Sequence, residues 1–124
     1  MARDFDGVGD RIACGSGASV DNLGSLSLVS WIAVDKWNPP GANSRLINKE
    51  GAGQGWLLFT DSAASATGVY FNVAFTTTQL TKGAWNQTTA DGQWHRYFVT
   101  YDGSTNNTGV SIYFDGRQLS YNDT

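Results

Sequence analysis

The sequence predicts an all-β protein with two antiparallel sheets, a β-sandwich of the jelly-roll type. Three observations favour this fold: apolar and polar residues alternate over short segments, turn-forming residues separate these segments at fairly regular intervals, and no segment shows the 3.6-residue repeat of a helix. The 15 glycines and the 13% of aromatic residues agree with many short strands joined by turns. A chain of 124 residues is long enough for one core, so we expect a single domain over residues 1–124.

The clearest element is a hairpin near the C-terminal end. In residues 96–101 and 110–115, aromatic or β-branched residues recur at every second position, which is the period of a strand. The loop between them, residues 102–109, has no apolar residue. Asp115-Gly116 signals a second tight turn, after which residues 117–121 are expected to pair back. The intervening positions also hold some aromatic residues, so both faces of this hairpin are expected to be partly covered.

Shorter strands are expected to precede this hairpin. They are predicted at Asp4–Asp6, Arg11–Cys14, Leu26–Val34, Leu46–Ile47, Gly55–Thr60 and Val69–Phe75, with Thr76–Leu80 as a continuation or an edge strand. In residues 26–34 both sets of alternate residues are largely apolar, which is typical of a central strand covered on both faces. Loops are predicted at residues 15–24, 37–41, 62–66 and 82–90, where glycine, proline or small polar residues gather.

Four stretches of the chain carry motifs of a known family. They are FDGVGD at residues 5–10, LSLVSWI at 26–32, RLINK at 45–49, and DGQWHRYFVTYDGS with VSIYFDGRQL at 91–104 and 110–119. In this order they resemble the laminin G-like, pentraxin-like branch of the concanavalin A-like lectin/glucanase superfamily. The resemblance implies a jelly roll and places Trp31 and Trp94 in the core.

The C-terminal end departs from that family pattern. Members of the family continue with further strands that close the sandwich, whereas this chain stops at Thr124. We therefore expect either a trimmed domain or missing strands that another chain supplies. An incomplete sandwich leaves an open sheet edge, and such an edge recruits a second copy or a strand-donating partner.

Composition argues against several classes of partner. The net charge is −3 and the eight basic residues are scattered singly, which argues against nucleic-acid binding. No segment approaches the ~20 apolar residues of a membrane-spanning helix, so no membrane insertion is expected. We expect no signal peptide, because Met1 is followed directly by the first expected strand. Because its abrupt start resembles that of some tailed-phage virion proteins, we expect an extracellular or virion-surface location.

We expect no enzymatic activity. The superfamily includes glucanases that use paired carboxylates as nucleophile and general acid. In these glucanases the carboxylates lie on a strand with a motif that resembles E-x-D-x-x-E. This chain has one glutamate, Glu50, and lacks the motif. Its one histidine, His95, lies at the start of a strand and is expected to be packed or hydrogen-bonded, since a zinc site needs several His or Cys ligands. The one cysteine, Cys14, cannot form an intrachain disulfide and is expected to be a small buried side chain.

Calcium is the one cofactor that the sequence suggests. The turn from Asp6 to Asp10 offers two carboxylates and glycine carbonyls, which are oxygen ligands of the kind that calcium takes. The family resemblance implies a structural calcium near a rim of the sandwich, with one ligand often supplied by the C-terminal strands. The alternative is that both carboxylates only make hydrogen bonds within their own turn.

Candidate carbohydrate-binding residues come from the tryptophans, of which the chain has five. Sugars stack on exposed aromatic faces and are oriented by nearby polar side chains. Trp37, before two prolines, and Trp85, beside Asn86, lie in predicted loops with polar neighbours, and Trp56 opens a strand. We therefore predict these four residues as the ligand-binding set. The alternative is that the tryptophans cap the ends of the sandwich.

Together these observations predict a non-catalytic recognition or adhesion module that binds carbohydrate or a protein. The alternative is a structural or assembly protein, such as a phage virion decoration or tail component, that uses the same fold for protein contacts. An exposed aromatic pair with polar neighbours would favour the first function. A large apolar interface between copies would favour the second.

Overall fold

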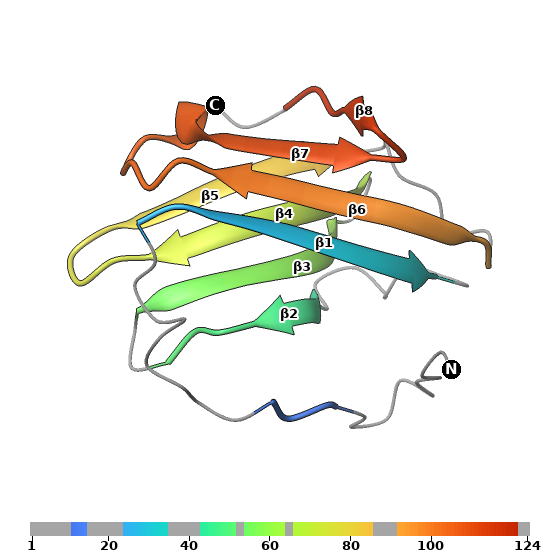
Figure 1. The fold of residues 1–124 in the computed structure, drawn as a ribbon, viewed down its shortest axis with the longest axis horizontal. Helices are drawn as coiled ribbons and strands as arrows, with labels where there is room; N and C mark the ends of the chain where they lie inside the picture. Colours follow the sequence, from blue (N-terminus) through green and yellow to red (C-terminus); the bar gives the residue numbers. More distant parts are fainter. Residues whose placement is uncertain are drawn as a thin grey trace.

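The computed structural model describes residues 11–14, 24–34, 43–51, 54–63, 66–85 and 92–121. These residues form two antiparallel sheets of four strands each, which is compatible with a β-sandwich and confirms the all-β class (Figure 1). The front sheet has the strand order β1-β6-β7-β8, and the back sheet has the order β2-β3-β4-β5. The strands are β1 (Leu26–Ala33), β2 (Asn43–Asn48), β3 (Gly55–Ala63), β4 (Ala66–Ala74), β5 (Gln79–Trp85), β6 (Trp94–Tyr101), β7 (Val110–Phe114) and β8 (Arg117–Gln118). Among these residues, no helix is long and apolar enough to cross a membrane.

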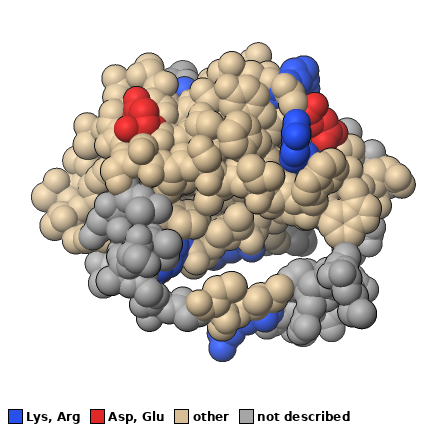
Figure 2. Space-filling view, viewed as in Figure 1, with Lys and Arg blue, Asp and Glu red and all other residues tan. Residues whose placement is uncertain are grey.

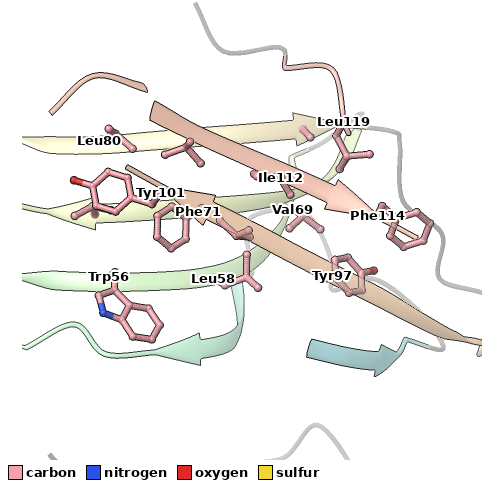
Figure 3. Close-up of a cluster of buried hydrophobic side chains, with 14 residues drawn as sticks. Trp56, Leu58, Val69, Phe71, Leu80, Tyr97, Tyr101, Ile112, Phe114 and Leu119 are labelled. Carbon is pink, nitrogen blue, oxygen red and sulfur yellow. The ribbon is translucent and has the colours of Figure 1, made fainter. Parts of the chain in front are cut away.

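The core lies between the two sheets and is built from alternate residues of each strand. Because a strand sends successive side chains to opposite faces, one set from each strand fills this layer. Figure 3 shows Leu58 and Phe71 of the back sheet meeting Tyr97, Tyr101 and Ile112 of the front sheet. The buried cluster consists of Trp56, Leu58, Val69, Phe71, Val73, Leu80, Ala84, Tyr97, Val99, Tyr101, Val110, Ile112, Phe114 and Leu119.

The predicted C-terminal hairpin is confirmed. The register of β6 and β7 runs from Tyr97 opposite Phe114 to Tyr101 opposite Val110. The connecting loop contains one short 3-10 helix, η2 (Asn107–Gly109), whose start is capped by a hydrogen bond that the backbone N–H of Thr108 donates to the Asn106 side chain. This loop needs no apolar contact because its polar side chains satisfy its own backbone.

The chain also pairs back after the second turn, as predicted. Asp115 and Gly116 adopt φ values of 50° and 83°, which close the tight turn between β7 and β8. Beyond β8, the backbone N–H of Leu119 donates to the carbonyl of Ile112, and the backbone N–H of Ile112 donates to the Tyr121 hydroxyl. Residues 117–121 therefore lie along the free side of β7 and bury Leu119 in the core.

Two predicted loops in the back sheet are wrong, because cross-strand pairing extends the strands further than local composition indicates. Residues 62–66 belong largely to a hairpin in which β3 and β4 pair up to Ala63 opposite Ala66. The loop predicted from residue 82 begins later, since β5 continues to Trp85. Backbone hydrogen bonds to a neighbouring strand stabilise these residues, whatever their own propensity.

Two predictions near the N-terminus are also wrong. Residues Arg11–Cys14 form no strand, and Cys14 is exposed instead of buried. None of the strands that the structure describes pairs with this segment. A short apolar run without a neighbouring strand lacks the hydrogen bonds that define a β-strand.

Strand β1 was predicted to be central and covered on both faces, and the structure corrects this. In the order of the described strands it is the edge of the front sheet, paired with β6 alone, and Val29 on its outer face is 59% exposed. Coverage on both faces occurs in the back sheet, where Leu57, Tyr70 and Asn72 are buried although they point away from the core. The presence of apolar residues in both alternate sets of a strand therefore does not show that the strand is central in its sheet.

One charged side chain lies in the core layer. Lys82 of β5 stands between Leu80 and Ala84 on the inward set and is buried, with its Nζ 4.0 Å from the centroid of the Tyr121 ring. The lysine stem covers apolar surface while the ammonium reaches the aromatic ring. Because β5 is the last strand in the order of the back sheet, this inward-pointing charge disfavours the addition of a further strand there.

Candidate functional site

The outer face of the front sheet carries a cluster of five large apolar residues, four of which are aromatic. The outward set of β1 includes Val29 and Trp31, that of β6 includes Trp94 and Phe98, and that of β7 includes Tyr113. We call these five residues the aromatic face. Trp31 is 60% exposed and Trp94 is 54% exposed, whereas Phe98 and Tyr113 are half-buried. Large apolar side chains so exposed, in one cluster, are uncommon on a soluble protein and mark interaction sites.

Strand register makes the aromatic face continuous. Val29 lies opposite Phe98, which lies opposite Tyr113, and the rings of Phe98 and Tyr113 are 5.5 Å apart between centroids. Trp31 lies opposite Arg96, which is two residues after Trp94, so the two tryptophans are diagonal neighbours. Diagonal positions on neighbouring strands are roughly 7–8 Å apart, within reach of indole side chains. The five side chains therefore form one patch.

Charge is sparse on this face. Figure 2 shows the front of the molecule as largely uncharged, with basic and acidic side chains gathered toward one end and acidic ones toward the other. Arg96 is the charged residue of the outward set of β6, where it lies opposite Trp31. Ser27, Thr100 and Ser111 supply hydroxyl groups at other outward positions of the front sheet. The face thus combines aromatic surface with hydroxyl donors and one cation.

A polar network links the start of β6 to the turn after β7. The Asp115 carboxylate accepts a hydrogen bond from the backbone N–H of Arg96 at 2.8 Å and contacts Nδ1 of His95 at 2.6 Å. The backbone N–H of Asp115 donates to the carbonyl of Arg96 at 2.9 Å. The His95 ring also packs against Phe114, with ring centroids 4.6 Å apart and an angle of 30° between the ring planes. His95 is therefore packed and hydrogen-bonded, as the sequence predicts.

This network favours the ionised form of Asp115. The hydrogen bond from the Arg96 backbone, then that from the His95 side chain, lower the pKa of the Asp115 carboxyl below its usual value of 3.8. A carboxyl with a depressed pKa in the folded state contributes stability above its unfolded pKa. That contribution disappears as the pH falls through the folded pKa.

We therefore expect Asp115→Asn to lower the free energy of unfolding by less than about 1 kcal/mol at pH 7. The amide cannot offer a charged acceptor, but solvent screens much of the interaction of a carboxylate that is 45% exposed. Asparagine tolerates the positive φ of this turn, so the substitution isolates the charge. Urea unfolding at pH 7 and at pH 3 measures the effect. The difference between the two proteins should shrink below pH 3.8, and a difference that grows with acid would contradict this assignment.

The structure does not bring the predicted ligand residues together. Trp56 is 9% exposed and belongs to the core, where an indole offers little surface for stacking. Trp85 ends β5 opposite Gly68, whereas Trp56 lies opposite Val73, five positions further along β4. At about 3.4 Å per residue, these two positions are roughly 17 Å apart along the sheet. Trp37 and Asn86 lie outside the described residues.

Trp56 also lines a cavity at one end of the sandwich. The cavity measures about 200 Å³ and lies between the two sheets, with Phe75 and Tyr101 in its wall. Gly24, Gly55 and Gly103 line the same cavity. It lies at the end of β4 near Ala74, away from the end that carries Trp31 and Trp94.

Trp31 and Trp94, assigned to the core by the family resemblance, are exposed, and that assignment is wrong. In β1 and β6 both alternate sets contain large apolar residues, so composition does not say which set faces inward. One signal was present in the sequence: Trp31 shares its set with Ser27, and Trp94 shares its set with Arg96 and Thr100. Polar residues in one alternate set of a strand indicate that this set faces solvent, so Ser27, Arg96 and Thr100 indicated an outward position for both tryptophans.

The described residues contain no group of three or more His, Cys, Asp or Glu side chains placed to hold a metal ion. Asp6 and Asp10 lie outside those residues, so the calcium site stays a prediction. In comparisons with known proteins, no family, no curated protein and no solved structure matches this chain. The laminin G-like resemblance therefore also stays a prediction, based on the four motifs alone.

Proposed function

We propose that this chain is a non-catalytic recognition module of the jelly-roll type that binds carbohydrate through its aromatic face. The observation that carries the proposal is the exposure of Trp31 and Trp94 as diagonal neighbours on one sheet face. Indole rings stack on the C–H surfaces of sugar rings, and exposed pairs of them provide an apolar platform with little loss of side-chain entropy. Polar side chains between and beside the rings orient the ligand.

The surroundings of the two tryptophans support a sugar ligand. Phe98 and Tyr113 extend the platform along the sheet, and the hydroxyls of Ser27, Thr100 and Ser111 occupy neighbouring outward positions. Hydroxyl groups donate and accept, which suits the hydroxyls of a glycan. A non-catalytic role fits the position of Asp115, the carboxylate at the end of this sheet. It is engaged by His95 and Arg96, and it has no second carboxylate in this network to form the acid and base pair of a glycosidase.

Trp31→Ala and Trp94→Ala should each weaken glycan binding by about tenfold or more, equivalent to about 1.4 kcal/mol per tenfold step. A glycan array identifies ligands of the wild-type protein, and titration calorimetry compares the variants. Thr77→Ala, an exposed substitution in the turn between β4 and β5, serves as the control and should bind like wild type. Thermal unfolding checks that each variant is folded. Unchanged affinity in both tryptophan variants would overturn the assignment of this face.

The assembly alternative has one observation in its favour, the edge strand β1. This strand is eight residues long, and its described neighbour is β6 alone. Its inward residues Leu26, Leu28 and Ile32 pack against the core but are only half-buried. A second strand beside β1 would bury them and satisfy the backbone groups at this edge. If assembly is the function, light scattering should show a defined oligomer at micromolar concentration, and the array should show no glycan ligand.

A further inference from the structure

We propose that the ligand of the aromatic face is an acidic glycan, whose carboxylate or sulfate group binds the guanidinium of Arg96. This inference rests on the carbohydrate-binding function proposed above and specifies the chemical class of the sugar. It depends on where Arg96 lies, on how its side chain is engaged, and on the geometry with which a guanidinium recognises anions.

Arg96 lies within the aromatic face. It is directly opposite Trp31, and it is two residues from both Trp94 and Phe98 on the same side of β6. Directly opposite positions place their Cβ atoms roughly 4.5–5.5 Å apart. The outward positions of β1, β6 and β7 are Ser27, Val29, Trp31, Ala33, Trp94, Arg96, Phe98, Thr100, Ser111 and Tyr113. Arg96 is the one charged residue in this set, and its side chain is exposed.

The Arg96 side chain is not part of a structural ion pair in the described residues. The nearby carboxylate belongs to Asp115, and both of its oxygens are engaged: Oδ2 contacts Nδ1 of His95, and Oδ1 accepts from the Arg96 backbone N–H. Attraction by the Arg96 cation is the smallest of the effects that lower the pKa of Asp115. Among the residues that the structure describes, no side chain therefore occupies the guanidinium donors, although Asp115 offsets part of the positive charge.

The guanidinium of Arg96 lies next to the turn that follows β7. Gly116 lies beside it, since a Cβ at Gly116 would be 3.3 Å from Nη2 of Arg96. The guanidinium thus extends from the aromatic face toward the turn of Asp115 and Gly116. Because Arg96 lies directly opposite Trp31, the substituents of a sugar stacked on Trp31 would come within reach of the Arg96 side chain. The planar fork of arginine binds carboxylates and sulfate-like oxyanions with two parallel hydrogen bonds, which few other side chains do.

The salt dependence of binding distinguishes an acidic glycan from a neutral one. The whole chain carries a net charge of −3, so long-range attraction does not bring an acidic polymer to the surface. Binding then depends on the local contact with Arg96. The affinity for an acidic glycan should fall as salt concentration rises, because screening weakens an exposed ion pair, whereas affinity for a neutral analogue should change little.

The test compares matched ligands and matched variants by titration calorimetry and affinity electrophoresis. Polygalacturonate and its methyl-esterified form share one sugar backbone and differ in the carboxylate charge. Dextran sulfate and dextran provide the corresponding pair for the sulfate ester. We expect wild type to prefer the charged member of at least one pair by about tenfold or more. Arg96→Gln should remove this preference, and Arg96→Lys should retain part of it.

Arg45→Gln is the control for loss of one positive charge, because Arg45 is exposed on β2 of the back sheet. It should keep the preference for the charged glycans. Equal binding of charged and uncharged members, with no effect of Arg96→Gln, would overturn the acidic-glycan proposal and leave the carbohydrate function intact. A wild-type protein that binds no polysaccharide of either kind and no glycan on the array would overturn both proposals.

Discussion

Phe71→Ala is expected to lower the free energy of unfolding by about 3–5 kcal/mol, the usual cost of removing a buried aromatic ring. Phe71 of β4 is fully buried, and it lies opposite Leu58 on β3 and Lys82 on β5. Its ring centroid is 6.0 Å from that of Tyr101 in the front sheet. The ring therefore joins the two sheets, and the substitution would leave a cavity between them. Urea unfolding followed by tryptophan fluorescence measures the loss.

Phe98→Ala is the matched control. Phe98 is in the front sheet but points outward, where it is half-buried against Tyr113. We expect a loss below about 1.5 kcal/mol, in the range of substitutions outside a core. Similar losses for the two phenylalanines would contradict the assignment of inner and outer faces. The same variant shows whether the aromatic face can be altered without unfolding the protein.

Gly103→Ala is expected to destabilise the protein by about 2–4 kcal/mol, because two effects act at once. Gly103 adopts a φ of 91°, which side-chain-bearing residues rarely adopt. A Cβ at this position would also overlap the backbone carbonyl of Gly24, at the start of the segment that leads into β1. The loop after β6 and the entry to β1 would have to move apart. Thermal and urea unfolding of the purified variant measure this cost.

Gly24→Ala tests the same contact from its other side. A Cβ at Gly24 would meet no atom within 4 Å, and its φ lies outside the positive range. We expect a change of less than about 0.5 kcal/mol, as for an ordinary surface substitution. Equal destabilisation by the two alanine substitutions would contradict this assignment, because Gly24→Ala introduces neither a clash nor a strained φ.

The candidate site could be predicted from the sequence only in part. The alternation in β6 is enough to place Trp94, Arg96 and Phe98 on one face of that strand. The alternation in β1 likewise places Val29 and Trp31 together. Neither pattern says that these two sets meet, because the pairing of Trp31 with Arg96 joins residues 65 positions apart in the sequence (96 − 31). The carbohydrate residues predicted from local loop signals, among them Trp56 and Trp85, depended on neighbours in sequence and missed this cross-strand patch.

The sequence by itself determined the all-β class, the hairpin of β6 and β7, and the return of residues 117–121 along β7. These features depend on local alternation and on turns such as Asp115-Gly116, which short stretches of chain specify completely. Only the tertiary structure decided that β1 is an edge strand, that Lys82 lies in the core layer, and that Trp31 and Trp94 face outward. Alternation divides a strand into two sets of side chains, but the set that becomes buried is chosen by packing against strands distant in sequence.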